Sequence, residues 1–334
     1  MSVVDQQPQQ DNEKQADRGG SLGVARNLGL VIAFVILCIV GIITAGDRFA
    51  STDNMLTILR FAAVIGVVSI GMTFVITGGG IDLSVGALVA LSSIWATTTG
   101  TQAMADNFGW IVMVVSAVLV GTASGVINGV LIAYGRIVPF IATLAMLASA
   151  RGLAEIIADR KNQIIRNQGF TDFFGAEPLG IPVIVIIFAV VTLAGWFLLN
   201  RTTFGRRTFA VGGNPEAARL AGIKVQRHTV YLYALLGMAC GIAAVMLMSR
   251  TTIGSSTHGQ LYELDAIAAV VIGGTLLSGG RGTVVGTLFG VLIFATLTNV
   301  FTLNNLSTSA QAVAKGVIIV IAVLLQQRIA QRKT

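Results

Sequence analysis

The chain has 334 residues, of which 54% are hydrophobic and only 11% are charged. Soluble domains carry about 25% charged residues, so this composition excludes an ordinary soluble protein. The net charge of +7 is typical of a membrane protein with excess Lys and Arg on its cytoplasmic side, and it does not indicate nucleic-acid binding. Cys38 and Cys240 both lie in apolar runs, so no disulfide framework is predicted.

The first 27 residues are polar, rich in Gln and without periodicity, which predicts a disordered cytoplasmic tail. They are not a secretory signal, because the apolar run starts late and no small-residue cleavage site follows it. Residues 28–326 are predicted to form one transmembrane domain, and residues 327–334 a basic cytoplasmic tail.

Ten apolar segments approach the length of about 20 residues that crosses some 30 Å of hydrocarbon. They predict an all-α polytopic membrane protein with about ten transmembrane helices. The third and eighth segments are short, and each is either spanning or re-entrant. The segments are Leu28–Ala45, Thr57–Thr77, Val85–Thr99, Trp110–Tyr134, Val138–Ile157, Val183–Asn200, Thr229–Met248, Asp265–Leu277, Val284–Phe301 and Ala310–Leu325.

The distribution of charge predicts the topology. With a cytoplasmic N-terminus and ten spans, fourteen Lys and Arg residues fall in inner loops and five in outer loops, a clear positive-inside bias. Ten spans, or eight with both short segments re-entrant, place both termini in the cytoplasm. The inner cations are Lys14, Arg18, Arg26, Arg136, Arg201, Arg206, Arg207, Arg219, Lys224, Arg227, Arg281, Arg328, Arg332 and Lys333; the outer ones are Arg48, Arg160, Lys161, Arg166 and Arg250.

Three short motifs recur and indicate an internal repeat. The segment 73–79 (TFVITGG) is similar to 275–280 (TLLSGG), and 121–127 (GTASGVI) is similar to 286–292 (GTLFGVL). A basic residue followed by glycine then occurs as Arg151-Gly152 and as Lys315-Gly316. We expect the first copy to begin at the second segment and the second copy near the eighth. Duplicated bundles, often inverted, are common in transporters, and chance similarity among Gly-rich apolar segments is the alternative.

The segment Gly78–Gly86 (GGGIDLSVG) is the sharpest local signal. Three successive glycines break a helix, and Ser84 is a good N-cap for the next span. A carboxylate at membrane depth costs roughly 2.5–3.5 kcal/mol, so Asp82 is expected at an interface, in a cavity or against a partner. Two interpretations stay open: Asp82 ties down a loop, or Gly79, Gly80, Asp82 and Ser84 belong to a translocation path or gate.

Three other polar residues are candidates for the same path or gate. Asn128 lies within a long span, where a hydrogen bond between helices is as good an interpretation as a pathway. Glu263 and Asp265 are placed near the outer end of their span and interpreted as loop-anchoring or gate residues.

Catalytic and cofactor motifs are absent from the sequence. There is no Gly-x-x-x-x-Gly-Lys-Ser/Thr segment, so the chain has no P-loop of its own. His228 and His258 lie far apart without ligand spacing, so no metal site is predicted. We therefore expect a protein that is not an enzyme and binds no cofactor itself.

The most basic and least hydrophobic interval is 202–228, within a cytoplasmic loop of 201–228. Asn214 followed by Pro215 is typical of a helix cap and first-turn proline. Glu216 in the first turn suits the helix dipole, and Gly222 is a typical terminator. A short surface helix is therefore predicted over Glu216–Ala221.

Three separate stretches carry a family resemblance. Phe204–Ile223 (FGRRTFAVGGNPEAARLAGI) resembles the cytoplasmic coupling loop of monosaccharide permeases of binding-protein-dependent ABC importers, the ribose, xylose, arabinose and galactose group, related to branched-chain amino acid permeases. Gly79–Gly86 and Tyr262–Thr275 resemble other hallmarks of that family, and the similarity runs roughly from residue 55 to 325. Only the core E-A-A-x-x-x-G of the loop matches, since the usual ending Ile-x-Leu-Pro is missing.

The resemblance implies a permease subunit of the bacterial inner membrane that imports a monosaccharide. It implies a second permease copy, cytoplasmic ATPase subunits that bind the ATP, and a periplasmic sugar-binding protein. The basic residues around the loop are expected to contact membrane lipid and the ATPase. The alternative is that they reflect only the general excess of cations on the cytoplasmic side. They are Arg206, Arg207, Arg219, Lys224 and Arg227. The implied ATPase-coupling residues are Asn214, Pro215, Glu216, Ala217, Ala218, Arg219 and Gly222.

Two alternatives from other classes remain. An ion-coupled secondary transporter of a small polar solute would need an essential intramembrane carboxylate, for which Asp82 is the only fair candidate. A membrane scaffold without transport activity would use the basic loop to recruit a soluble partner.

Overall fold

A computed structural model describes residues 28–331, so the predicted tail 1–27 and residues 332–334 lie outside the described residues. The helices are Leu28–Ala45, α2 (Asp47–Ala50), α3 (Thr52–Thr77), α4 (Val85–Thr97), α5 (Thr99–Phe108), α6 (Ile111–Ala133), α7 (Pro139–Ala158), α8 (Gln168–Gly175), α9 (Val183–Arg201), α10 (Thr203–Gly213), α11 (Pro215–Leu220), α12 (Val225–Thr251), α13 (Tyr262–Ile272), α14 (Val284–Leu303) and α15 (Thr308–Gln331), with a 3-10 turn η1 at Pro178–Gly180.

The predicted all-α membrane fold is confirmed. Each of the ten predicted apolar segments coincides with a helix, and seven described helices are long and apolar enough to cross a membrane. The β-structure of the described residues is one antiparallel pair of two-residue strands, β1 (Gln163–Ile164) and β2 (Ile253–Gly254). α15 reaches Gln331, so it includes the first residues of the predicted C-terminal tail.

The two short segments form helices that are too short to span. α4 has 13 residues and α13 has 11. At 1.5 Å per residue they extend about 20 Å and about 17 Å, against about 30 Å of hydrocarbon. α4 therefore covers about two thirds of the membrane and α13 just over half, so each must be completed by the loop beside it.

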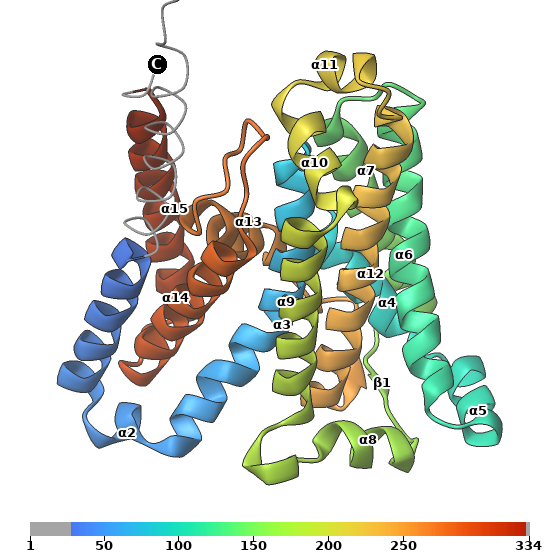
Figure 1. Cartoon of the computed structure of the whole chain (residues 1–334). Helices are drawn as coiled ribbons and strands as arrows, with labels where there is room; N and C mark the ends of the chain where they lie inside the picture. The colour runs from blue at the N-terminus through green and yellow to red at the C-terminus, as the bar shows by residue number, and fades with distance from the viewer. Residues whose placement is uncertain (1–27, 332–334) are drawn as a thin grey trace, which may run out of the picture.

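Two opposite faces of the molecule are defined by the connections. α10, α11 and the loop 273–283 lie at one end, which we call the α11 face, and α2, α5 and α8 lie at the other, which we call the α8 face (Figure 1). From α3 onward the long and short apolar helices alternate in direction between these faces, including α4 and α13. The alternation predicted for ten segments is therefore present.

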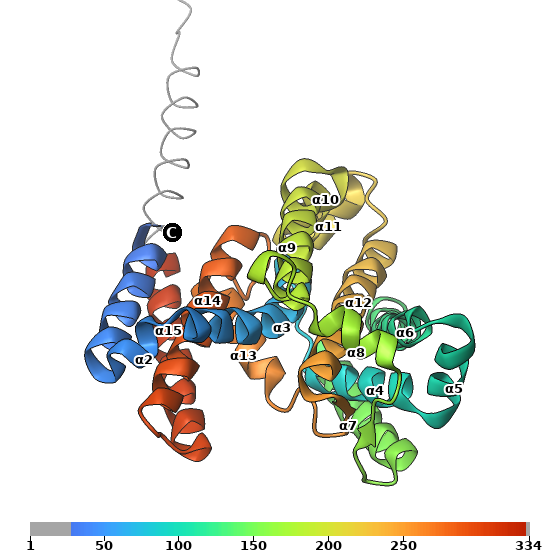
Figure 2. The same ribbon diagram turned by 90° about the horizontal axis from the view of Figure 1, so that it is seen from below.

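α3 and α12 form the centre of the bundle. In their most apolar windows 83% and 67% of residues are buried, compared with 11% for Leu28–Ala45. Seen from below, α3 runs between a group containing α14 and α15 and a group containing α4, α6 and α12 (Figure 2). The other long helices surround this pair, and many of their apolar side chains are exposed.

Glycines let α6 and α12 approach at backbone distance. A Cβ on Gly125 would lie 2.2 Å from the carbonyl oxygen of Tyr233, and one on Gly237 would lie 2.2 Å from that of Gly121. Gly129 meets Val230 in the same way, so the two helices run antiparallel. Small residues supply such contacts in lipid, where no hydrophobic force draws helices together.

α3 and α14 form a second antiparallel pair, which is held by side chains at both ends. Asn54 and Asn299 exchange two amide hydrogen bonds of 3.1 and 2.7 Å near the α8 face. Thr73 and Thr287 share a hydroxyl hydrogen bond of 2.7 Å toward the α11 face. Both pairs are buried, so these helices are fixed in register along most of their length.

The internal repeat is inverted. The pair of α3 with α14 matches the pair of α12 with α6, and α3 and α12 are themselves antiparallel, since Gly71 meets Leu236 and Ala239 whereas Gly78 meets Leu232. The second copy therefore begins with α12 and not near the eighth segment, as expected from the sequence. The similarity of 73–79 to 275–280 led to the wrong start for the second copy, because both motifs lie where a helix ends near the α11 face.

Packing of α6 on α12 predicts a steric test. Gly237→Ala should lower the free energy of unfolding of the purified protein by about 1–3 kcal/mol, because the new methyl group meets backbone atoms that can move only with their whole helix. Thermal unfolding in detergent measures this. Gly152→Ala on α7 is the matched control, since no atom lies within 4 Å of its Cβ; equal stability of the two variants would contradict the packing account.

Candidate functional site

α11 is a single turn and a half of helix with a complete N-terminal cap. The side-chain Oδ1 of Asn214 accepts a hydrogen bond of 3.0 Å from the backbone N–H of Ala217. Pro215 occupies the first turn, where its missing N–H is not needed. Glu216 also lies in the first turn, where the helix dipole favours a negative charge. The predicted helix Glu216–Ala221 is thus present, shifted by one residue at each end.

The C-terminus of α11 is closed by a Schellman motif. The N–H of Gly222 donates to the carbonyl of Arg219 and that of Ile223 to the carbonyl of Ala218, both at 3.0 Å. Gly222 has φ of +83°, a conformation that only glycine adopts readily. No atom lies within 4 Å of its Cβ position, so conformation, not space, requires glycine here.

The outer surface of α11 is unusually exposed. Leu220 is 89% exposed, whereas Ala218 on the inner side is 4% exposed. Glu216 and Arg219 form an ion pair of 3.5 Å with both side chains more than 70% exposed, and such surface pairs contribute little to stability. The helix therefore presents one large apolar side chain with a charged pair beside it.

Backbone contacts join the base of α11 to two transmembrane turns. A Cβ on Gly212, near the end of α10, would lie 1.8 Å from the carbonyl oxygen of Thr77, the last residue of α3. The same carbonyl accepts a 2.9 Å hydrogen bond from the N–H of Gly280. Gly279 in turn meets the backbone of Gly79. We call this meeting of α10, the turn after α3 and the loop 273–283 the glycine junction.

The turn between α3 and α4 is fixed by a buried polar cluster. Both the N–H and the hydroxyl of Ser84 donate to Oδ1 of Asp82, at 2.7 and 2.6 Å. The amide of Asn128 on α6 donates to Oδ2 of Asp82 at 3.2 Å and to the Ser84 hydroxyl at 3.0 Å. All three side chains are fully buried. Ser84 occupies the predicted N-cap position of α4, but its hydroxyl is bonded to Asp82 and makes no cap hydrogen bond to the helix.

Tyr233 of α12 holds the same turn from another side. Its hydroxyl donates to the carbonyl of Ile81 at 3.0 Å, and a Cβ on Gly80 would lie 2.6 Å from that hydroxyl. Gly79 has φ of +82°. The predicted path residues Gly79, Gly80, Asp82, Ser84 and Asn128 are therefore brought together in one place.

Glu263 and Asp265 lie deeper than the sequence suggested. The loop 255–261 turns back into the bundle, and a Cβ on Gly86 at the start of α4 would lie 2.1 Å from the carbonyl of Gly259. That Cβ would also lie 2.8 Å from Oε2 of Glu263. Glu263 and Asp265 thus lie in the first turn of α13, the end away from the α11 face, and this turn sits beside the first turn of α4 within the bundle.

Two cations hold the loop and the first turn of α13, residues 255–265, which we call the re-entrant segment. Arg151 on α7 donates to the backbone carbonyls of Ser256 and His258, the latter at 2.9 Å. Lys315 on α15 pairs with Asp265 at 3.1 Å, with side chains only 19% and 23% exposed. Sequence reasoning did not assign these cations to the site, although they had been singled out as the equivalent basic–glycine motifs of the repeat.

The two histidines of the described chain are engaged by hydroxyl groups. Nε2 of His228 lies 2.9 Å from the hydroxyl of Thr208, and Nδ1 of His258 lies 3.2 Å from that of Ser93. Within residues 28–331 no three side chains of His, Cys, Asp or Glu form a group that could hold a metal ion.

Comparison with known families identifies the chain. The family model described as "branched-chain amino acid transport system / permease component" matches residues 54–324. The chain belongs to this family. It is accordingly a multi-pass membrane protein of the inner membrane and a permease component of sugar importers of the ABC type. The matched range includes the glycine junction, α11 and the re-entrant segment.

Curated relatives cover almost the whole chain. A ribose import permease protein of Bacillus subtilis is 44% identical over 92% of this chain and 94% of its own length. An L-arabinose ABC transporter permease protein of Azospirillum brasilense is 37% identical, covering 93% and 90%. A fructose import permease protein of Rhizobium meliloti is 36% identical, covering 89% and 84%. No solved structure shows significant similarity to the chain.

The pair of Lys315 with Asp265 predicts a double-mutant test. Lys315→Met should destabilise the protein by about 1–3 kcal/mol, because it leaves a half-buried carboxylate without its partner, and Lys315→Met with Asp265→Asn should recover most of that loss. Thermal unfolding of the unaltered protein and of these two variants measures it.

The exposed pair of Lys161 with Asp159 is the control. Its hydrogen bond of 2.6 Å lowers the pKa of Asp159, but the side chains are 78% and 83% exposed, so Lys161→Met should change stability little. Equal effects of Lys315→Met and Lys161→Met would show that the inner pair does not hold the re-entrant segment.

Proposed function

We propose that this chain is the membrane permease subunit of an importer that moves a monosaccharide into the cytoplasm, driven by ATP hydrolysis on a separate subunit. Relatives named as permeases for ribose, L-arabinose and fructose support a monosaccharide as substrate. The observation that carries the proposal is α11: a capped, exposed helix joined through α10 to the ends of two transmembrane elements.

The α11 face is assigned to the cytoplasm, and both termini with it. The positive-inside rule supports this, because cations concentrate in the segments at this face. These cations are Arg136, Arg201, Arg206, Arg207, Arg219, Lys224, Arg227 and Arg281.

The ATPase subunit docks on α11 in this proposal. Leu220 supplies an apolar anchor, and the pair of Glu216 with Arg219 supplies charged contacts around it. A buried apolar anchor within a polar rim is the usual construction of a protein interface. The caps at Asn214 and Gly222 keep the helix formed without the partner, so little ordering entropy opposes binding.

Movement of α11 is transmitted through the glycine junction. α10 cannot shift without moving Thr77 and Gly280, because Gly212 already touches their backbone atoms. Closing of the ATPases therefore displaces the turn after α3 and the loop after α13 together. Since these turns belong to opposite copies of an inverted repeat, one push acts on both halves of the bundle, as alternating access requires.

The predicted path residues divide into two roles. Gly79 and Gly80 belong to the turn that moves, and they form a gate at the cytoplasmic end of the path. Asp82, Ser84 and Asn128 hold this turn, as Glu263 and Asp265 hold the start of α13. Asp82 is a positioning residue here and not an ion carrier, because both carboxylate oxygens already accept hydrogen bonds from Ser84 and Asn128.

The remaining partners follow from the same assembly. A second permease copy completes the pathway, and a periplasmic sugar-binding protein delivers substrate to the α8 face. ATP is bound by the ATPase subunit, and the permease itself needs no cofactor, in keeping with a sequence that has no P-loop.

Docking on α11 gives a first test. Leu220→Asp and Glu216→Lys should each leave membrane insertion unchanged and reduce co-purification of the ATPase subunit at least about tenfold, because both side chains are exposed and the ion pair of Glu216 with Arg219 lies at the surface. Pull-down from solubilised membranes measures this.

Asp172→Lys on the exposed helix α8 is the control, because it makes the same charge reversal on the opposite face, and this variant should bind the ATPase normally. Normal binding by all three variants would contradict docking at α11.

Transmission through the glycine junction gives a second test, with neighbouring glycines as variant and control. Gly212→Ala should retain ATPase binding and lose most ATP-dependent sugar uptake in the reconstituted importer, because its Cβ would lie 1.8 Å from the Thr77 carbonyl and cannot fit without shifting the junction. For Gly213 the nearest atom is 3.9 Å from the Cβ, so Gly213→Ala should transport normally. Equal uptake by the two variants would exclude this route of coupling.

A further inference from the structure

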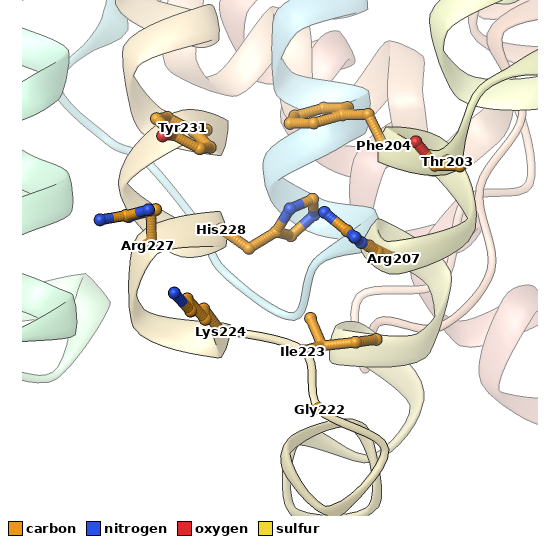
Figure 3. A pocket seen from close by; sticks show the side chains of 9 residues that line it. All are labelled: Thr203, Phe204, Arg207, Gly222, Ile223, Lys224, Arg227, His228 and Tyr231. Carbon is orange, nitrogen blue, oxygen red and sulfur yellow. The ribbon is translucent and has the colours of Figure 1, made fainter.

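A cationic hollow lies between α10 and α12, directly beside the C-terminal cap of α11 (Figure 3). It has a volume of about 520 Å3, and its cations are Arg207 from α10 and Lys224 and Arg227 from the start of α12. We call it the α10–α12 hollow. A second hollow of about 500 Å3 shares Gly222, Ile223, Lys224 and Arg227 with it. That second hollow also includes Glu216 and Arg219 and belongs to the proposed docking surface.

The positive charge of the α10–α12 hollow is not compensated within the described chain. None of its lining residues is a carboxylate, and no ion pair of residues 28–331 includes Arg207, Lys224 or Arg227. Like charges gathered around one small space repel each other, and an anion placed between them removes that cost. The hollow therefore selects a negatively charged ligand.

The wall of the hollow is firmly held. His228 is 5% exposed, its Nε2 lies 2.9 Å from the hydroxyl of Thr208, and its ring packs on Phe204 with centroids 4.7 Å apart. In Figure 3 the guanidinium of Arg207 extends toward His228 from the α10 side, Lys224 comes from the α12 side, and the Arg227 side chain extends away from Arg207. Arginine with lysine on opposing walls is the arrangement that recognises a phosphate group.

The depth of the hollow matches the headgroup layer of a bilayer. It opens where α9 ends at Arg201 and where α12 begins at Val225. The Arg201 guanidinium lies 5.4 Å from the centre of the Trp196 ring, and such aromatic residues anchor helices at the membrane interface. Tyr231 lines the hollow one turn further into the membrane and is 52% exposed, which offers a surface for an acyl chain.

We propose that the α10–α12 hollow binds the phosphate headgroup of an anionic phospholipid. Basic pockets beside transmembrane helices on the cytoplasmic side suit such headgroups. A phosphate between Arg207 and Lys224 joins α10 to α12, the two helices that carry α11. The site itself follows from the geometry of this chain; only its consequence, a fixed base for the coupling helix, rests on the proposed function.

The test compares two double variants that remove the same charge. Native mass spectrometry of the purified full chain measures binding of phosphatidylglycerol, with phosphatidylcholine as the uncharged lipid. Arg207→Gln with Lys224→Gln should weaken phosphatidylglycerol binding by about tenfold or more, whereas Arg206→Gln with Arg136→Gln should not, because those cations do not line the hollow. The permease is measured alone, so a failure of the proposed transport function would leave this result unaffected.

Three outcomes would overturn the proposal. Equal weakening by both double variants would mean that lipid responds only to total charge. Binding of soluble glycerol 3-phosphate as tight as that of phosphatidylglycerol would assign the hollow to a free phosphate ester. Unchanged lipid binding together with lost ATPase co-purification in Arg207→Gln with Lys224→Gln would make these cations a protein contact.

Discussion

Backbone contact between antiparallel helices is the constraint on which the rest of this structure depends. In lipid, apolar side chains gain nothing by leaving one apolar surface for another, so helices must be held by close packing and hydrogen bonds. Gly125 and Gly237 bring α6 against α12 at distances that no Cβ would allow. The equivalent pair of α3 and α14 instead uses side-chain amides and hydroxyls. These two pairs fix the frame within which the shorter elements are placed.

The short helices α4 and α13 end inside that frame, where lipid offers no water to the unpaired N–H and C=O groups of helix ends. Two loops are therefore held in place by side chains. Asp82 organises the turn before α4, and Arg151 with Lys315 holds the segment before α13 from α7 and α15. Charged residues that look like transport machinery in sequence therefore use their hydrogen bonds to keep irregular backbone in place at depth.

Much of the fold was predictable, because hydrophobic runs and helix caps are local signals. All ten apolar segments became helices, and Asn214, Pro215 and Gly222 marked α11 to within a residue. What failed depended mostly on contacts distant in sequence. Ser84 lies at the predicted N-cap position, but its hydroxyl donates to Asp82 and accepts from Asn128 on α6. The depth of Glu263 was misjudged because nothing local shows that a loop turns inward. The importance of Gly212 was likewise invisible, since its neighbour Thr77 is 135 residues away.

The double attachment of α3 to α14 has a mechanical consequence. With Asn54 bound to Asn299 at one end and Thr73 to Thr287 at the other, the two helices behave as one stiff rod. α3 has 26 residues and is about 39 Å long at 1.5 Å per residue, so it spans the whole bilayer. In the proposed mechanism, a displacement applied beside Thr77 would tilt this rod as a unit. The α8 face would then move together with the α11 face, without a relay of side chains between them.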